Sequence, residues 1–366
     1  MPRFPHHADM VGSLLRSRQL IDARAARSAG AMSADDLRSI EDAAVADAVR
    51  RQEDVGLPAV TDGEFRRDWW HLDFLEGLGG MGTAERARPK DFSGEGEMPP
   101  IPVVDGTVHH RGAIFVDAYE HLHACATRSI PKITIPGPGM ANLMGGPAAI
   151  SGDAYPDKAK FWDDLVAAYR AEVELLYSAG CRYLQMDDVG FAYLCDPDFR
   201  DQMVARGEDP DELVVTYRDA MNAVIADRPA DLIVSTHMCR GNFRSRWVAS
   251  GGYEPIAEAV FGSLDVDAFF LEFDDDRSGG FEPLRHLAPG KTAVLGLVTT
   301  KTPHLEDPDR IKRQIETASQ FVPAERLALS PQCGFSSSHH GNDITEDQQW
   351  EKLRLVVDVA ADVWGS

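Results

Sequence analysis

The stretch Ser235-Thr236-His237-Met238-Cys239 decides how this chain is interpreted, because a short apolar run here ends in two residues that bind soft metal ions. On a β-strand, side chains two residues apart point to the same face, so His237 and Cys239 face one ion together. Imidazole and thiolate ligands favour zinc over magnesium or calcium. The stretch therefore predicts half of a zinc site at the end of a strand.

Two further ligands follow much later in the chain. A lone Glu272 stands 33 residues after Cys239, and a lone Cys333 stands 61 residues after Glu272; each lies at or near the end of a short apolar run. These gaps are far wider than those of a zinc finger. A metal gathered from three separate strand ends is more often catalytic than structural. We therefore predict a catalytic Zn²⁺ held by His237, Cys239, Glu272 and Cys333.

Short apolar runs alternate with longer amphipathic segments along the chain. The predicted strands are Met10–Ser13, Ala59–Thr61, Lys132–Ile135, Tyr183–Met186, Leu232–Ser235, Phe269–Leu271, Ala293–Gly296 and Leu327–Leu329. Helical periodicity extends over Ser33–Asp54, Phe161–Ser178, Asp307–Gln320 and Thr345–Val363. Eight strands that alternate with helices predict an α/β fold, a (β/α)8 TIM barrel with a parallel inner sheet.

The segment 71–130 departs from this alternation. It contains Gly79-Gly80-Met81-Gly82 and Pro99-Pro100-Ile101-Pro102, which are typical of turns and irregular backbone. We interpret it as an inserted hairpin or lid within a single domain that covers residues 1–366. Trp69 and Trp70 precede the segment, and we expect them to pack against it.

The amino-acid composition limits the classes of partner that the protein can bind and indicates its cellular compartment. The chain has 366 residues and a net charge of −22, which disfavours nucleic acid and anionic membranes as partners. Its five cysteines are an odd number without disulfide-type spacing, which is typical of a reducing cytosol. The N-terminus lacks a signal-peptide pattern, and no apolar run is long enough to span a membrane. We expect a cytoplasmic protein.

These motifs, taken in order, resemble the catalytic barrel of the cobalamin-independent methionine synthase family almost end to end. The matching segments are Val11-Gly12-Ser13, Thr61-Asp62-Gly63-Glu64, Gln185-Met186-Asp187-Asp188, Thr236-His237-Met238-Cys239, Leu271-Glu272-Phe273 and Ser330-Pro331-Gln332-Cys333-Gly334. The resemblance implies zinc on the four ligands named above. It also implies that an amino-acid thiol, homocysteine in the family, is bound at the barrel mouth. The implied binding residues are Gly12, Ser13, Glu64 and Asp187, of which Glu64 and Asp187 also count as catalytic.

The chain departs from the full-length family pattern and is similar to its shorter, core-only branch. The family's tryptophan for methyl-folate is missing from the loop Pro136-Gly137-Pro138-Gly139-Met140. Its general-acid histidine follows the seventh strand, where this chain reads Val298-Thr299-Thr300-Lys301-Thr302, with His304 out of register. We therefore expect a methyl donor other than polyglutamyl methyl-folate. Methylcobalamin or a methylated corrinoid protein is the expected donor.

The ligand chemistry agrees with thiol alkylation. Two thiolates and one carboxylate give the zinc site a formal charge of 2 − 3 = −1, so a substrate sulfur there stays electron-rich and nucleophilic. We predict a zinc-dependent methyltransferase that makes methionine from homocysteine.

Three alternatives remain open. The first is a thiol alkyltransferase of the epoxyalkane–coenzyme M transferase type, and the second is a uroporphyrinogen-decarboxylase-like lyase. The third is a zinc-storing or structural barrel. Asp274-Asp275-Asp276 is interpreted as a solvated loop, and His339 and His340 have no assigned role.

Overall fold

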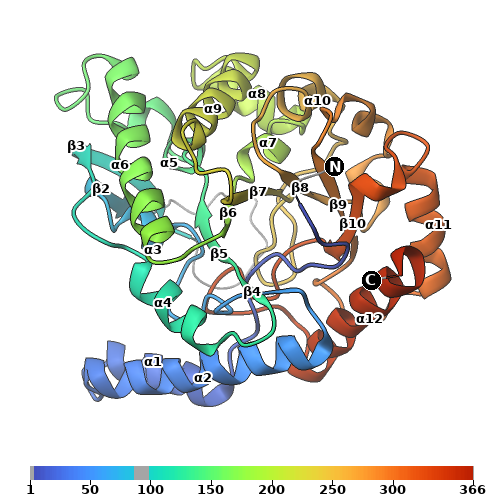
Figure 1. The fold of residues 1–366 in the computed structure, drawn as a ribbon. Coiled ribbons are helices and arrows are strands. Elements are labelled where there is room, and N and C mark those ends of the chain that lie inside the picture. Colours follow the sequence, from blue (N-terminus) through green and yellow to red (C-terminus); the bar gives the residue numbers. More distant parts are fainter. Residues whose placement is uncertain (1–3, 86–98, 366) are drawn as a thin grey trace.

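A (β/α)8 barrel is formed by residues 4–85 and 99–365, the part of the chain that this computed structural model describes (Figure 1). Its strands are β1 (Ala59–Val60), β4 (Ile130–Pro131), β5 (Ile133–Pro136), β6 (Tyr183–Asp187), β7 (Ile233–Met238), β8 (Ala268–Glu272), β9 (Thr292–Val298) and β10 (Leu327–Pro331). Strands β5 to β10 form one parallel sheet in chain order, and β4, which pairs with β1, leads directly into β5. The predicted TIM barrel is confirmed.

The first predicted strand, Met10–Ser13, is wrong as a strand. The chain closes the barrel slightly earlier, through a single parallel bridge between Ala8 and Leu329. The carbonyl groups of residues 10–12 accept hydrogen bonds from the side chains of Lys132, Gln185 and Thr61. Because these side chains take the place of a neighbouring strand's backbone, the segment lines the barrel without forming a ladder.

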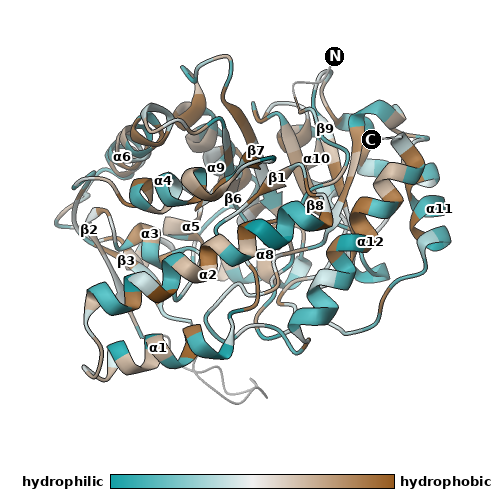
Figure 2. Ribbon diagram, turned by 60° about the horizontal axis from the view of Figure 1, so that its bottom comes forward, coloured by the Kyte–Doolittle hydropathy of each residue, from teal (hydrophilic) through white to brown (hydrophobic). Residues whose placement is uncertain are grey.

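Helices surround the barrel on its outside (Figure 1). They are α1 (Arg18–Ser28), α2 (Ala34–Val55), α3 (Leu72–Leu75), α4 (Val116–Cys125), α5 (Met140–Leu143), α6 (Lys158–Ser178), α7 (Gly190–Tyr193), α8 (Pro197–Ala205), α9 (Pro210–Ile225), α10 (Glu254–Phe261), α11 (Pro308–Ala318) and α12 (Glu346–Trp364). Short 3₁₀ helices are Gly146–Ala149, Asp276–Ser278, Glu282–His286 and Ala324–Arg326. The four predicted helices are confirmed as α2, α6, α11 and α12. Ser33 and Thr345 cap α2 and α12, and Figure 2 shows hydrophilic residues on the outward faces of these two helices.

The predicted insertion contains an antiparallel hairpin, β2 (Gly79–Ala84) and β3 (Ile101–His109), which confirms that expectation. Residues 86–98, between the two strands, lie outside the described part of the chain. The register shifts between Gly79 and Met81, where Gly80 has φ of 75°. A Cβ atom at Gly80 would lie 2.4 Å from the Thr107 carbonyl oxygen, so this kink requires glycine.

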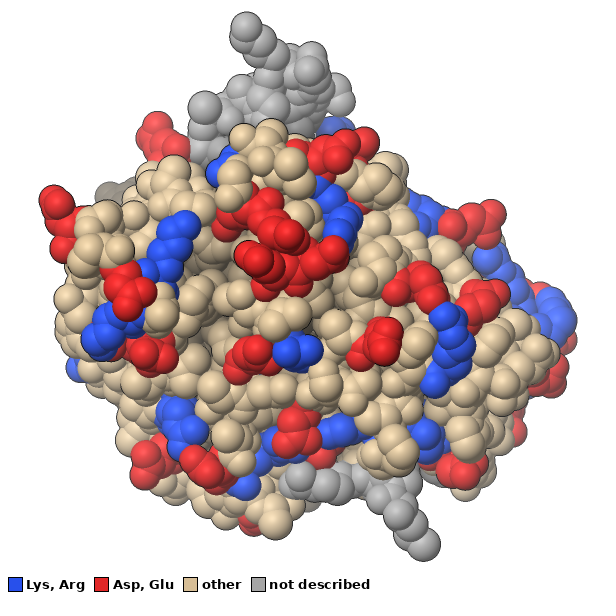
Figure 3. Space-filling model, turned by 90° about the horizontal axis from the view of Figure 1, so that it is seen from above, with Lys and Arg blue, Asp and Glu red and all other residues tan. Residues whose placement is uncertain are grey.

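Acidic side chains gather into a patch on the face shown in Figure 3, whereas lysine and arginine are dispersed over it. The net charge of −22 is therefore visible as a surface that repels phosphate groups. Among residues 4–85 and 99–365, no helix combines the length and apolarity needed to cross a bilayer.

A buried ion pair lies inside the barrel, beneath the strand ends that carry the site. Lys132 and Asp9 are both fully buried, with 2.8 Å between Nζ and Oδ1. The Tyr183 hydroxyl donates to the other oxygen of Asp9 at 2.8 Å, and the Gln185 side-chain oxygen accepts from Lys132 at 3.2 Å. Burial lowers the pKa of Lys132, and the Asp9 carboxylate opposes that effect. The Asp9 carboxylate therefore offsets part of the cost of burying the Lys132 ammonium group.

We expect Lys132→Met to lower the free energy of unfolding by about 3–5 kcal/mol, because it leaves the Asp9 carboxylate buried without its cation. The matched control is the double variant Lys132→Met/Asp9→Asn, which removes both charges and recovers part of the loss. Urea denaturation measures both values. A loss below about 1 kcal/mol at an unchanged denaturant dependence would contradict this account.

Candidate metal centre and substrate cavity

Three of the four predicted metal ligands meet at one end of the barrel. The ligand atoms of His237, Cys239 and Cys333 lie within 4.8 Å of one another, and all three residues are buried. We call these three residues the metal group. His237 lies in β7, Cys239 follows that strand directly, and Cys333 follows β10 by two residues. Parallel pairing of the strands between them brings all three to the same rim.

The geometry of the metal group fits zinc. The two sulfur atoms are 3.6 Å apart, whereas a disulfide bond would place them about 2.05 Å apart. In a tetrahedral site with zinc–sulfur bonds of about 2.3 Å, the sulfur atoms lie about 3.8 Å from each other. Two thiols and one imidazole, free of a disulfide, are therefore spaced as zinc ligands require.

The two thiols affect each other's ionisation. A hydrogen bond from the Cys239 thiol lowers the pKa of Cys333, although burial acts in the opposite direction. The same contact, together with burial, raises the pKa of Cys239. One sulfur of the pair thus readily carries a negative charge, which is the form that binds a metal.

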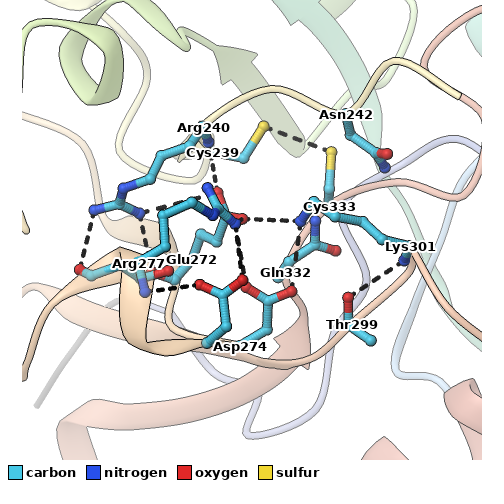
Figure 4. A network of polar contacts seen from close by, with 12 residues as sticks. Cys239, Arg240, Asn242, Glu272, Asp274, Arg277, Thr299, Lys301, Gln332 and Cys333 are labelled. Atoms are coloured by element: carbon cyan, nitrogen blue, oxygen red, sulfur yellow. Dashed lines mark hydrogen bonds and ion pairs between the residues drawn. The ribbon is translucent and has the colours of Figure 1, made fainter. Parts of the chain in front are cut away.

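Glu272, the fourth predicted ligand, ends β8 beside this group but points into a network of cations (Figure 4). Its Oε1 atom accepts from Lys301 Nζ at 2.9 Å and from an Arg277 nitrogen at 2.8 Å. Its Oε2 atom accepts from the backbone N–H of Arg240 at 2.5 Å. Burial alone would raise the pKa of Glu272, but Lys301, Arg277 and Arg240 hold it at about 2. The carboxylate is therefore ionised and held by these cations, and it is not among the ligand atoms that the structure brings together in the metal group.

The expectation of a solvated loop shortly after Glu272 is wrong for one residue, Asp274. Asp275 and Asp276 are exposed, as expected for a solvated loop, but the Asp274 side chain is only 3% exposed and lies 3.4 Å from Lys301 Nζ. Burial raises the pKa of Asp274 to about 6, against the effect of Lys301. Sequence reasoning missed Lys301 and Arg277 as part of the site. The available signal was the position of Lys301 directly after the seventh barrel strand, where the family histidine is expected.

A cavity of about 140 Å³ opens onto the metal group. Its polar lining combines the metal group with the residues predicted to bind substrate: Ser13, Glu64, Asp187, His237, Cys239 and Cys333. Gly12 is not part of the lining. Instead, a Cβ atom at Gly12 would lie 2.9 Å from Glu64 Oε1 and 2.8 Å from Thr134, so its small size admits the Glu64 carboxylate.

Asp187 connects the cavity to the metal group. Its Oδ1 atom accepts from the Gln185 side chain at 2.7 Å and lies 3.6 Å from His237 Nδ1. Burial raises the pKa of Asp187 to about 7, helped by the Glu64 carboxylate and opposed by His237. A cation in the cavity would favour the ionised carboxylate.

Glu64 faces the same cavity from the loop after β1. Its backbone has φ of 58°, a left-handed conformation that costs energy for a residue other than glycine. Its carboxylate accepts from the Thr134 hydroxyl at 2.8 Å and lies 3.8 Å from Arg67. Burial raises the pKa of Glu64 against the effect of Arg67. The strained loop thus places a second carboxylate where a substrate cation can reach it.

Ser13 lies at the floor of this cavity. Its hydroxyl oxygen accepts from the backbone N–H of Ser336 at 3.1 Å. A Cβ atom at Gly334 would lie only 2.0 Å from that oxygen, so the two loops meet closely because residue 334 is glycine. Asn242, which sequence reasoning missed, also lines the cavity, and its side-chain oxygen is buried without a hydrogen-bond partner in the described residues. It offers an acceptor for a substrate group.

The opposite wall of the cavity is aromatic and apolar. Trp69 and Trp70 line it, so the expectation that they only pack the insertion is wrong. Trp69 stacks on Phe243, with ring centroids 6.0 Å apart. His339 and His340 contact the far side of Trp69, with ring centroids at 5.6 and 6.0 Å, and are not part of the lining. They support the wall.

Two loops differ from the family pattern as the sequence indicates. Met140, the first residue of α5, lines the cavity, and the segment 136–140 contains no tryptophan. After β9, Lys301 is buried and faces Glu272, whereas His304 is exposed. His304 is not among the residues that line the cavity.

Comparison with known proteins gives a consistent result. Residues 7–362 match the family model "Cobalamin-independent synthase, Catalytic domain". The chain is 44% identical over 361 residues to YxjH of Bacillus subtilis (strain 168), covering 98% of this chain and 95% of YxjH. It is 23% identical over 331 residues to 5-methyltetrahydropteroyltriglutamate–homocysteine methyltransferase of Vibrio harveyi, covering 89% of this chain but only 40% of that longer protein.

Solved structures have the same fold. A crystal structure described as a putative vitamin-B12 independent methionine synthase from Listeria monocytogenes is 37% identical, with a TM-score of 0.79 over 99% of each chain. A B12-independent methionine synthase from Shewanella sp. W3-18-1, in complex with selenomethionine, has a TM-score of 0.73 at 20% identity, over 98% of this chain and 97% of that chain. At that identity the likeness concerns the fold alone.

We expect the purified protein to retain about one zinc ion per chain, and Cys333→Ser to lose most of it because the metal group loses a thiolate. The matched control is Cys181→Ser, since Cys181 is also buried but donates to the Tyr183 carbonyl. Elemental analysis after dialysis against a weak chelator measures retention. Equal zinc in the two variants would contradict this assignment.

Proposed function

Since this chain belongs to the family of cobalamin-independent methionine synthase catalytic domains, we propose that it is a zinc-dependent methyltransferase that converts homocysteine to methionine. One observation supports the proposal most strongly. A single cavity contains a metal group suited to zinc together with two buried carboxylates, Glu64 and Asp187. A thiol and an ammonium group on the same small molecule match these two features.

One set of residues acts on the sulfur of the substrate, and another set binds its amino-acid part. Zinc on the metal group, with Glu272 as an exchangeable fourth ligand, would keep the substrate thiol deprotonated at neutral pH. Overall, the thiol loses its proton and gains the methyl group, while the donor keeps the electron pair of the broken bond. Glu64 and Asp187 bind the ammonium group, and Ser13 lies beside the substrate carboxylate.

The residues that line the cavity are relevant to the identity of the methyl donor. We propose that the donor is not polyglutamyl methyl-folate, since the loop after β5 lacks the family's tryptophan, and that methylcobalamin or a methylated corrinoid protein takes its place. A cobalt leaving group needs no proton, which agrees with the lack of a histidine at the family's position after β9, since His304 is out of register. Trp69 and Trp70 line the same cavity from another loop, so methyl-folate with a short tail is the competing donor.

The alternatives are distinguished by the residues in the cavity. An epoxide-opening thiol transferase uses the same metal group, but a thiol without an amino group has no need of Glu64 and Asp187. A lyase of the uroporphyrinogen decarboxylase type has no need of the metal group. The five free cysteines support a reducing, cytoplasmic location.

The test is an assay for methionine with zinc-loaded protein and homocysteine. Methylcobalamin, monoglutamyl methyl-tetrahydrofolate and its polyglutamyl form are offered in separate reactions. Methionine from methylcobalamin supports the donor proposed here, and methionine from either folate replaces it. If no donor gives methionine, while an epoxide is opened by a thiol without an amino group, the proposed function is wrong.

We expect Asp187→Asn and Glu64→Gln each to raise KM for homocysteine about 10–100-fold, because each removes a charged partner of the ammonium group worth about 1.5–3 kcal/mol. The same variants are assayed with 4-mercaptobutanoate, which lacks only the amino group. Its KM is expected to change less than about threefold. Equal losses with both thiols would show that the carboxylates do not bind the ammonium group.

A further inference from the structure

We propose that Lys301 is a positioning residue: it draws the Glu272 carboxylate off the metal and so sets how readily the substrate sulfur takes the fourth coordination position. The inference rests on the zinc-dependent function proposed above. It concerns a residue to which the resemblance assigns no role, in the loop that follows β9 (Figure 4).

The Glu272 carboxylate has two potential partners, the cations that surround it and a metal ion on the metal group. Its Oε1 atom accepts two hydrogen bonds, from Lys301 at 2.9 Å and from Arg277 at 2.8 Å, so both lone pairs are occupied. Its Oε2 atom accepts one, from the backbone N–H of the residue that follows Cys239. The carboxylate thus lies beside a ligand of the metal group while its charge is directed toward Lys301.

Among these cations, Lys301 depends most on Glu272. The guanidinium groups of Arg277 and Arg240 also donate to backbone carbonyls, those of Ala249 for Arg277 and of Gly251 and Ser278 for Arg240. The Lys301 side chain is 8% exposed, and the only other acid within salt-bridge range in the described residues is Asp274, at 3.4 Å. An ammonium group buried without a close carboxylate is costly. Lys301 therefore opposes any movement of Glu272 to the metal.

The charge of the zinc-loaded metal group explains why keeping Glu272 away from the metal would favour binding of the substrate thiolate. Two protein thiolates and one substrate thiolate give a zinc site with a charge of 2 − 3 = −1. A bound Glu272 carboxylate in addition makes the charge 2 − 4 = −2, which disfavours entry of the substrate thiolate. Lys301 receives the departing carboxylate in a ready ion pair, so the exchange leaves no buried charge unpaired.

The test is Lys301→Met, which keeps an unbranched side chain, one atom shorter, and removes its charge. Glu272 then favours the metal, so zinc affinity in a chelator competition is expected to rise at least tenfold. Zinc X-ray absorption is expected to show a third sulfur only at homocysteine concentrations at least tenfold higher than for the wild type. The matched control, Lys301→Arg, keeps the charge and should change both values less than about threefold.

The double variant Lys301→Met/Glu272→Gln shows whether the effect passes through Glu272. It removes both charges of the pair together with the competing carboxylate, so it is expected to take up homocysteine sulfur at concentrations about tenfold lower than Lys301→Met requires. The proposal is overturned if Lys301→Met matches the wild type in zinc affinity and in homocysteine dependence, or if the double variant keeps the defect of the single one. A wild-type protein that binds no zinc would instead refute the proposed function.

Discussion

The parallel register of strands β5 to β10 is the constraint on which the whole site depends. Asp187 pairs with His237 across β6 and β7, and His237 pairs with Phe270 across β7 and β8. This register aligns the strand ends on one rim, where Cys239 and Cys333 meet although 94 residues separate them in the chain. A slip by one residue would turn the inward side chains outward. The metal group therefore exists only because the ladder is in register.

The metal group could be predicted from the sequence because its residue types are chemically specific. Histidine and cysteine side chains at the ends of apolar runs indicate a metal site. A barrel brings the ends of its strands together, so ligands that are far apart in the sequence can meet. Lys301 and Arg277 could not be assigned to the site in the same way, since most lysines and arginines lie on surfaces. The position of Lys301 shortly after the seventh barrel strand was a signal, but nothing local indicated Arg277. The first strand was wrong for a related reason, because long-range side chains rather than a neighbouring strand bind its carbonyl groups.

The two walls of the cavity have different origins. The residues of the polar wall lie at strand ends and in short loops, so they can be predicted once the strands are located in the sequence. The aromatic wall depends on Trp69, whose ring is supported by Phe243 and by His339 and His340 from distant parts of the chain. A pair of tryptophans before an insertion is equally compatible with packing. Only the tertiary structure shows that Trp69 lines the cavity.

Two buried lysine–carboxylate pairs in this barrel differ in what else competes for the carboxylate. Asp9, deep in the barrel, is bonded by Lys132 and Tyr183 and lies apart from the cavity lining, so no group in the cavity competes for its carboxylate. Glu272 has a comparable pair with Lys301 but accepts a hydrogen bond from the residue next to Cys239. A metal there offers the carboxylate a second favourable partner. We propose that the same kind of ion pair is structural inside the barrel and adjustable at the rim, where the substrate sulfur would enter.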